Sequence, residues 1–169
     1  MPGGESTLNS SGTTSRLEST LPAILADRYD ANGRRIQELA EALSEDQFWK
    51  KPFPFGNSFG HLVLHLTGNL SYYIGAQIAN SGYVRDRPRE FADAAPPSKA
   101  EALRRFDEAV AGAARTIRLQ TPGDWSAAYR ALGTNASNRL AIVLVCDSHM
   151  QHHIGQMIYL VEQWKAGPR

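Results

Sequence analysis

The 169 residues carry a net charge of +1, with 42% hydrophobic and 21% charged residues, a composition typical of a soluble globular domain. No basic block is present, which argues against a surface that follows nucleic-acid phosphates. The single cysteine, Cys146, excludes an internal disulfide and is most simply a small core side chain. No apolar run could span a bilayer, and the first 15 residues lack the apolar stretch of a secretory signal. We therefore expect a cytoplasmic protein with no nucleic-acid or membrane partner.

The chain begins with a segment rich in glycine, serine and threonine, residues 1–15, for which we expect disorder. The predicted domain covers residues 16–169, and apolar residues recur at helical spacing in its first part. Pro22 is tolerated only near the start of a helix. The regular part of the first helix is therefore expected to begin near Ser19 or Thr20.

The next segments have recognisable start signals. Residues 44–47 match a capping box that opens a short helical turn. Ser58 is expected to cap a second helix over residues 59–79. A charged connection, residues 83–97, follows this helix. Connections of that length are often functional, but a solvated crossover is the simpler interpretation and the one we favour.

Two more helices complete the chain. A second capping box, Ser98 to Glu101, predicts a third helix that ends near residue 119. Residues 124–136 are polar, and their pattern fits either a short hairpin or an irregular loop. Ser137 or Asn138 is then expected to cap a last helix that continues to about residue 165. Four long amphipathic helices without convincing strand alternation predict an all-α fold, a four-helix bundle.

The last helix contains three of the five histidines. His149 and His153 are four positions apart, so their imidazoles leave the same helix face and can hold one ion. His152 is the rival second ligand, because a spacing of three also works. The apolar stripe of this helix includes His153, has His149 at its edge and leaves His152 towards solvent. We therefore prefer His149 and His153.

Two histidines form a weak metal site, so a third ligand must come from elsewhere in the chain. His65 lies at the edge of the apolar stripe of the second helix, whereas His61 is turned further outward, so His65 is preferred. A lone histidine on a helix face is more often a hydrogen-bonded core or surface residue than a ligand. Three histidines at the inner edges of amphipathic helices are a less accidental arrangement and favour a metal site.

At these residues the chain resembles the DinB/YfiT-like superfamily of metalloenzymes, over most of residues 16–165. The resemblance is carried by residues 57–66 with Asn69, by residues 85–91 and by residues 149–156. The family pattern places a histidine seven residues after a helix-leading serine, as His65 follows Ser58, and ends in H-x-x-x-H-x-G-Q, as His149 to Gln156 does.

The resemblance implies an up-down-down-up bundle with a long crossover between its second and third helices, and a homodimer. It also implies a divalent metal bound by His65, His149 and His153, while His61 and His152 match no ligand position. Zinc or nickel is the first expectation for the metal, with iron and manganese as alternatives. Better understood relatives are metal-dependent thiol S-transferases, a maleylpyruvate isomerase that uses a low-molecular-weight thiol, and metal-dependent hydrolases.

Three functional hypotheses follow. The first is a metal-dependent transferase that activates a low-molecular-weight thiol, because no protein nucleophile is evident. The second is a hydrolase that uses metal-bound hydroxide. Such an enzyme normally needs a carboxylate base. The only acidic residue beside the histidines in the sequence is Asp147, and it points away from His149. The third is a non-catalytic, metal-stabilised dimer.

Several other residues are candidates for contact with a substrate. Asn69 and Gln156 could orient a substrate or a metal-bound ligand, since each lies near a predicted ligand on its helix. Arg85, Arg87 and Arg89 of the charged connection could attract a carboxylate, although surface arginines are usually only solvated.

Overall fold

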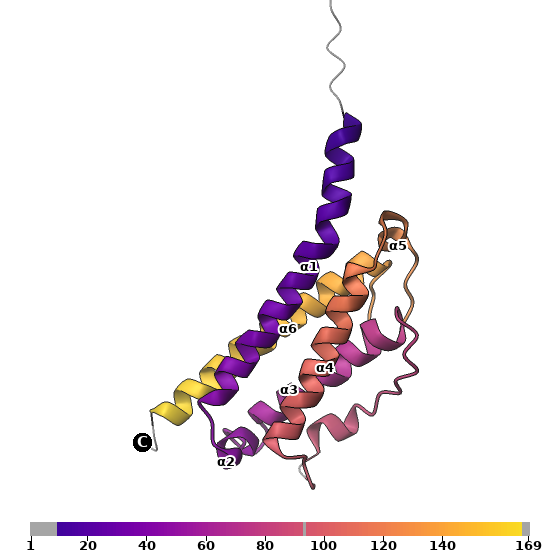
Figure 1. Cartoon of the computed structure of the whole chain (residues 1–169). Coiled ribbons are helices and arrows are strands. Elements are labelled where there is room, and N and C mark those ends of the chain that lie inside the picture. The colour runs from indigo at the N-terminus through magenta and orange to yellow at the C-terminus, as the bar shows by residue number, and fades with distance from the viewer. Residues whose placement is uncertain (1–9, 93, 167–169) are drawn as a thin grey trace, which may run out of the picture.

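The computed structural model describes residues 10–92 and 94–166, and its architecture is all-α. Four long helical segments form the body of the protein (Figure 1): α1 (Ser10–Glu41), α3 (Phe59–Leu70) with its π-helical continuation η1 (Ser71–Ala76), α4 (Lys99–Arg118) and α6 (Arg139–Lys165). Three short elements lie between them: α2 (Glu45–Trp49), the 3-10 turn η2 (Pro88–Phe91) and α5 (Pro122–Ser126).

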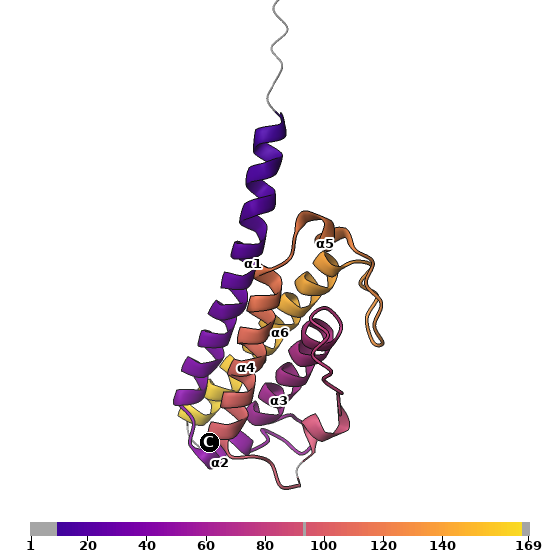
Figure 2. The same ribbon diagram turned by 45° about the vertical axis from the view of Figure 1, so that its right-hand side comes forward.

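The long helices form a bundle in which α1 and α3 each pack against α4 and α6. In Figures 1 and 2, α1 and α6 run in one direction, whereas α3 and α4 run in the opposite direction. Because α3 and α4 are parallel, the chain must return along the bundle between them, and residues 83–97 make that crossover. The arrangement is the up-down-down-up topology that the resemblance implied.

The helix starts follow local capping chemistry. Ser58 Oγ accepts from the backbone N–H of His61, and the His61 ring accepts in return from the Ser58 N–H, so His61 serves the start of α3. Asn138, rather than Ser137, caps α6 by accepting from Ala141 N at 2.8 Å. Ser98 caps α4, but Glu101 pairs with neighbouring arginines instead of completing the predicted capping box.

Other boundaries differ from the sequence-based expectation. Helix α1 begins at Ser10 and includes Pro22, so it takes in part of the segment expected to be disordered; residues 1–9 lie outside the described residues. Of the two alternatives for residues 124–136, the structure has the irregular loop; it follows the end of α5, and one bridge, Ala128 to Asn138, holds it to the start of α6. No helix among the described residues is long and apolar enough to cross a membrane.

Bulky side chains fill the core between the four long helices. The largest fully buried ones include Tyr29, Phe59, Phe106 and Met150, from α1, α3, α4 and α6 respectively. The Tyr29 hydroxyl donates to the Val143 carbonyl at 2.7 Å, so even this polar group is paired. Burial of such side chains is the main favourable contribution to folding, and it sets the position of α3 against α6.

Candidate metal centre

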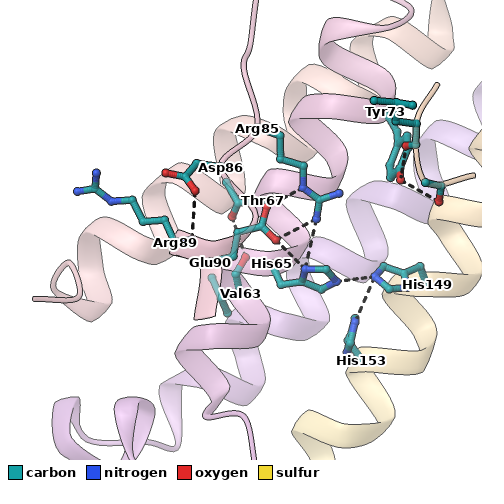
Figure 3. A network of polar contacts seen from close by, with 12 residues as sticks. Val63, His65, Thr67, Tyr73, Arg85, Asp86, Arg89, Glu90, His149 and His153 are labelled. Carbon is teal, nitrogen blue, oxygen red and sulfur yellow. Dashed lines mark hydrogen bonds and ion pairs between the residues drawn. The ribbon is translucent and has the colours of Figure 1, made fainter. Parts of the chain in front are cut away.

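Three histidine side chains from two helices meet at one point in the bundle (Figure 3). His65 comes from α3, and His149 and His153 come from successive turns of α6. Nε2 of His149 lies 2.9 Å from Nε2 of His65 and 3.2 Å from Nε2 of His153. His65 and His153 are buried, and His149 is partly exposed. Among the described residues, this is the group of histidine, cysteine and acidic side chains whose ligand atoms could surround an ion.

Partners at the other ring nitrogen orient two of these imidazoles. The Glu90 carboxylate and the Gln156 amide oxygen can only accept, so His65 Nδ1 donates to Glu90 Oε2 at 2.8 Å and His153 Nδ1 donates to Gln156 Oε1 at 2.7 Å. With the proton on Nδ1, Nε2 of each ring presents a lone pair to the centre. A single proton on His149 Nε2 could bridge only one of its two contacts. A cation bound by all three nitrogens satisfies every lone pair.

The nitrogen separations also fit a shared ion. Histidine nitrogens bind zinc at about 2.0–2.1 Å, which puts two ligands about 2.9 Å apart at a right angle and about 3.3 Å apart at the tetrahedral angle. The observed 2.9 and 3.2 Å fall in this interval. Three protein ligands leave at least one coordination position for another molecule, as in catalytic rather than structural zinc sites.

The protonation state favours metal binding. Burial, reinforced by the neighbouring imidazoles, lowers the pKa of His149 to about 4. Burial likewise lowers the pKa of His153 to about 4, and the hydrogen bond with Gln156 offsets this only in part. Both rings are therefore neutral near pH 7, the form in which imidazole binds metals.

The acidic residue beside the centre is Glu90, which the sequence analysis missed. Burial alone would raise the pKa of its carboxyl, but hydrogen bonds from His65 and Arg85 together lower it. Arg85 donates to Oε1 from Nε at 2.7 Å and to Oε2 from Nη2 at 2.9 Å. Asp147 instead faces α1, where it pairs with Arg28 and accepts from Asn32.

Gly68 explains how the carboxylate of Glu90 comes so close to α3. A Cβ built at position 68 would overlap Glu90 Oε1. The crossover therefore packs against the bare backbone of the helix, and both Arg85 and Glu90 have side chains largely removed from solvent. The interpretation of this segment as merely solvated was wrong for these two residues, because the buried ion pair sits directly behind His65.

The residues predicted to contact a substrate differ in whether they line the cavity beside the histidines. A cavity of about 740 Å³ opens beside His65 and His149, and Asn69, Arg85 and Arg87 are among the residues that line it. Arg89 is not part of that lining; its side chain points away from the histidines in Figure 3. The cavity also reaches Cys146, which is 1% exposed, and burial raises the pKa of its thiol to about 12.

The two rival histidines lie outside the cluster. His61 belongs to the start of α3, and its ring packs against Trp49 with 5.9 Å between ring centres. His152 is exposed, and its Nε2 contacts the amide nitrogen of Gln156 at 3.3 Å. His152 faces solvent, as the apolar stripe predicted. His61 was expected to turn outward, but it is only 2% exposed, because its ring completes the cap of α3 and packs against Trp49.

A model of the DinB superfamily matches residues 28–157, a span that contains all three clustered histidines. The crystal structure of a DinB-like protein from Bacillus cereus ATCC 10987 is similar in fold: the TM-score is 0.64 with 14% sequence identity, over 83% of this chain and 91% of that one. No curated protein matches the chain. With most of the bundle matched by the family model, the chain belongs to the DinB superfamily.

Proposed function

We propose that this protein binds a divalent cation through His65, His149 and His153 and catalyses transfer of a low-molecular-weight thiol to a small electrophile. The observation that carries the proposal is the convergence of three imidazole Nε2 atoms beside a cavity large enough for a small molecule. Such a cation supplies Lewis-acid chemistry, because it lowers the pKa of a thiol or water that it binds and polarises a carbonyl.

Residues around the histidines act on their orientation. Glu90 holds the proton of His65 on Nδ1, and Gln156 does the same for His153, so both rings keep their Nε2 lone pairs free. Arg85 fixes the Glu90 carboxylate in turn through two hydrogen bonds. The ligand geometry is thus set before any substrate enters, which favours binding of the metal and the thiol in the productive geometry.

The thiol reaction is favoured over hydrolysis by what the nearby side chains can do. A hydrolase needs a general base within reach of the attacking water. Glu90 lies on the Nδ1 side of His65, both of its oxygens are occupied, and its lowered pKa makes it a weak base. Cys146 is too deeply buried to act as a nucleophile, so the sulfur must come from a bound cofactor.

The test combines metal analysis with a transfer assay. His65→Ala and His153→Ala are expected to lose the metal and the conjugation of model electrophiles by bacillithiol, mycothiol or glutathione. His152→Ala is the matched control, since this exposed histidine lies on the same helix, and it should keep both. Unchanged conjugation rates on adding metal-loaded protein would refute the transferase.

Two other results would favour the competing functions. Metal-dependent ester or amide cleavage that is lost in His65→Ala would support a hydrolase. Metal binding without activity in either substrate screen would support a metal-stabilised bundle. We also propose that the protein is a homodimer, as the family resemblance implies, and that it is cytoplasmic, as expected from its sequence. Light scattering after size-exclusion chromatography and fractionation of cells check these two points.

A further inference from the structure

The cavity beside the histidines has an unbalanced positive charge. Among the described residues, its charged lining consists of Arg85 and Arg87, without a carboxylate. Glu90 neutralises Arg85 from behind. Arg87 forms no ion pair with any described residue, and its guanidinium lies over the Phe91 ring at 5.6 Å from the ring centre. Arg87 therefore leaves one uncompensated cation at the wall, which favours an anionic group on the ligand.

A second polar group of the wall lacks a partner. Asn69 follows His65 by one helical turn, so the two side chains lie on the same face of α3. Its side chain is 7% exposed and lines the cavity, yet its Oδ1 has no hydrogen-bond partner among the described residues. A buried carbonyl oxygen is rarely left unpaired, since the loss of its hydrogen bond to water costs free energy. The Oδ1 atom is itself buried, so it meets an N–H donor in the cavity only when the amide turns about its last torsion angle and exchanges the positions of Oδ1 and Nδ2.

The rest of the lining is mainly apolar or aromatic. Val84, Leu132 and Val145 stand at its exposed edge, and Tyr72 and Tyr73 form part of the wall. The volume of about 740 Å³ lies within the usual range for small-molecule sites and exceeds what a single amino acid fills. The occupant is thus a molecule with apolar segments, one anionic group and one N–H donor.

On the basis of the proposed function, we propose that the thiol is an N-acylated cysteine compound that carries a carboxylate. Its amide N–H donates to Asn69 Oδ1, its carboxylate pairs with Arg87, and its sulfur faces the three histidines. This assignment excludes simple alkyl thiols and thiols without an anionic group as the preferred cofactor.

Three unreactive probes test each part of this recognition. N-acetyl-S-methylcysteine has both groups, its methyl ester lacks the charge, and 3-(methylthio)propanoic acid lacks the amide. Binding to the purified full chain is measured by NMR titration at low ionic strength. The complete probe should bind more tightly than the ester by roughly three- to fivefold, the size expected for an exposed ion pair. It should bind more tightly than the propanoic acid by roughly five- to tenfold, the size expected for one hydrogen bond.

Variants connect the probes to the residues. Arg87→Gln should weaken the complete probe but not its ester, whereas Arg89→Gln, on the same crossover and outside the cavity, should change neither. Asn69→Leu should weaken the complete probe and its ester alike. It should also leave the melting temperature unchanged or raised, because it removes an unpaired buried polar group; a purely structural asparagine would instead lose stability.

The outcomes separate this inference from the proposed function. Failure to bind metal or to transfer a thiol contradicts the proposed function, while the binding order of the probes still reports on the cavity. Equal binding of the three probes, no binding of any, or wild-type binding by both Asn69→Leu and Arg87→Gln would overturn the assignment of the thiol.

Discussion

Replacing Glu90 by glutamine tests whether the crossover positions the metal centre. In the wild-type chain the carboxylate accepts from His65 Nδ1 at 2.8 Å and from Arg85 at 2.7 and 2.9 Å. A glutamine has the same shape, but its NH₂ group is a donor, so at least one of these contacts becomes donor against donor. His65 then loses the partner that fixes its tautomer and ring orientation.

The expected loss is substantial. Removing such a partner of a metal-binding histidine typically weakens metal binding about 10- to 100-fold, or about 1.4–2.7 kcal/mol. The metal-free protein should also lose about 1–3 kcal/mol in its free energy of unfolding, because Arg85 remains in a largely buried position without its counter-ion.

Competition with a chelator near pH 7.5 measures the zinc affinity. Urea unfolding of the metal-free protein measures the loss of stability. Asp86→Asn is the matched control, since Asp86 lies on the same crossover, is exposed and, within the part of the chain that the structure describes, accepts only from the Arg89 backbone. A Glu90→Gln protein that folds and binds zinc as tightly as wild type would refute a positioning role for Glu90.

Three further predictions concern the same region. Gly68→Ala places a Cβ against Glu90 Oε1, so zinc affinity should fall even though alanine favours helix by about 1 kcal/mol; an unchanged affinity would mean that the crossover adapts. Cys146, with a pKa raised to about 12 by burial, should resist thiol reagents at pH 8 until the chain is denatured, and rapid labelling of the native protein would contradict this. The metal-free protein should lose stability as the pH falls from about 6.5, the unfolded pKa of histidine, towards about 4, the pKa of His149 and His153 in the folded chain. The unfolded state binds more protons in this interval, so the free energy of unfolding should fall as the pH falls. A free energy of unfolding that stays constant between pH 7 and 5.5 would contradict this prediction.

Helix positions and faces follow from local chemistry, which is why the sequence predicts them well. Ser58 and Asn138 start α3 and α6 where their side chains can accept from the helix backbone. The spacing of apolar residues then predicts the faces of His65, His149, His152 and His153, but not that of His61, which was expected to turn outward and is buried. The apolar stripes place His65, His149 and His153 at their inner edges, and the three side chains do lie together. Their binding of a metal stays a proposal.

The crossover shows where local reasoning ends. Nothing in the periodicity of residues 83–97 indicates that Glu90 will be buried, since charged residues next to prolines usually belong to solvated loops. The carboxylate is buried because a loop passes over Gly68, two turns of helix after the start of α3 and far from Glu90 in sequence. The family-like segment from Arg85 to Phe91 was the one available signal, and it did not reveal which of its residues would touch His65.

The sequence alone determined the fold class, the four long helices and the faces of His65, His149, His152 and His153, because capping and helical periodicity act between residues a few positions apart. Only the tertiary structure decided that Glu90 and Arg85 stand behind His65, that Asp147 faces α1, and that an unpaired Asn69 oxygen lies beside the cavity. Those contacts depend on how parallel helices and their crossover pack, and packing joins residues whose separation along the chain carries no pattern.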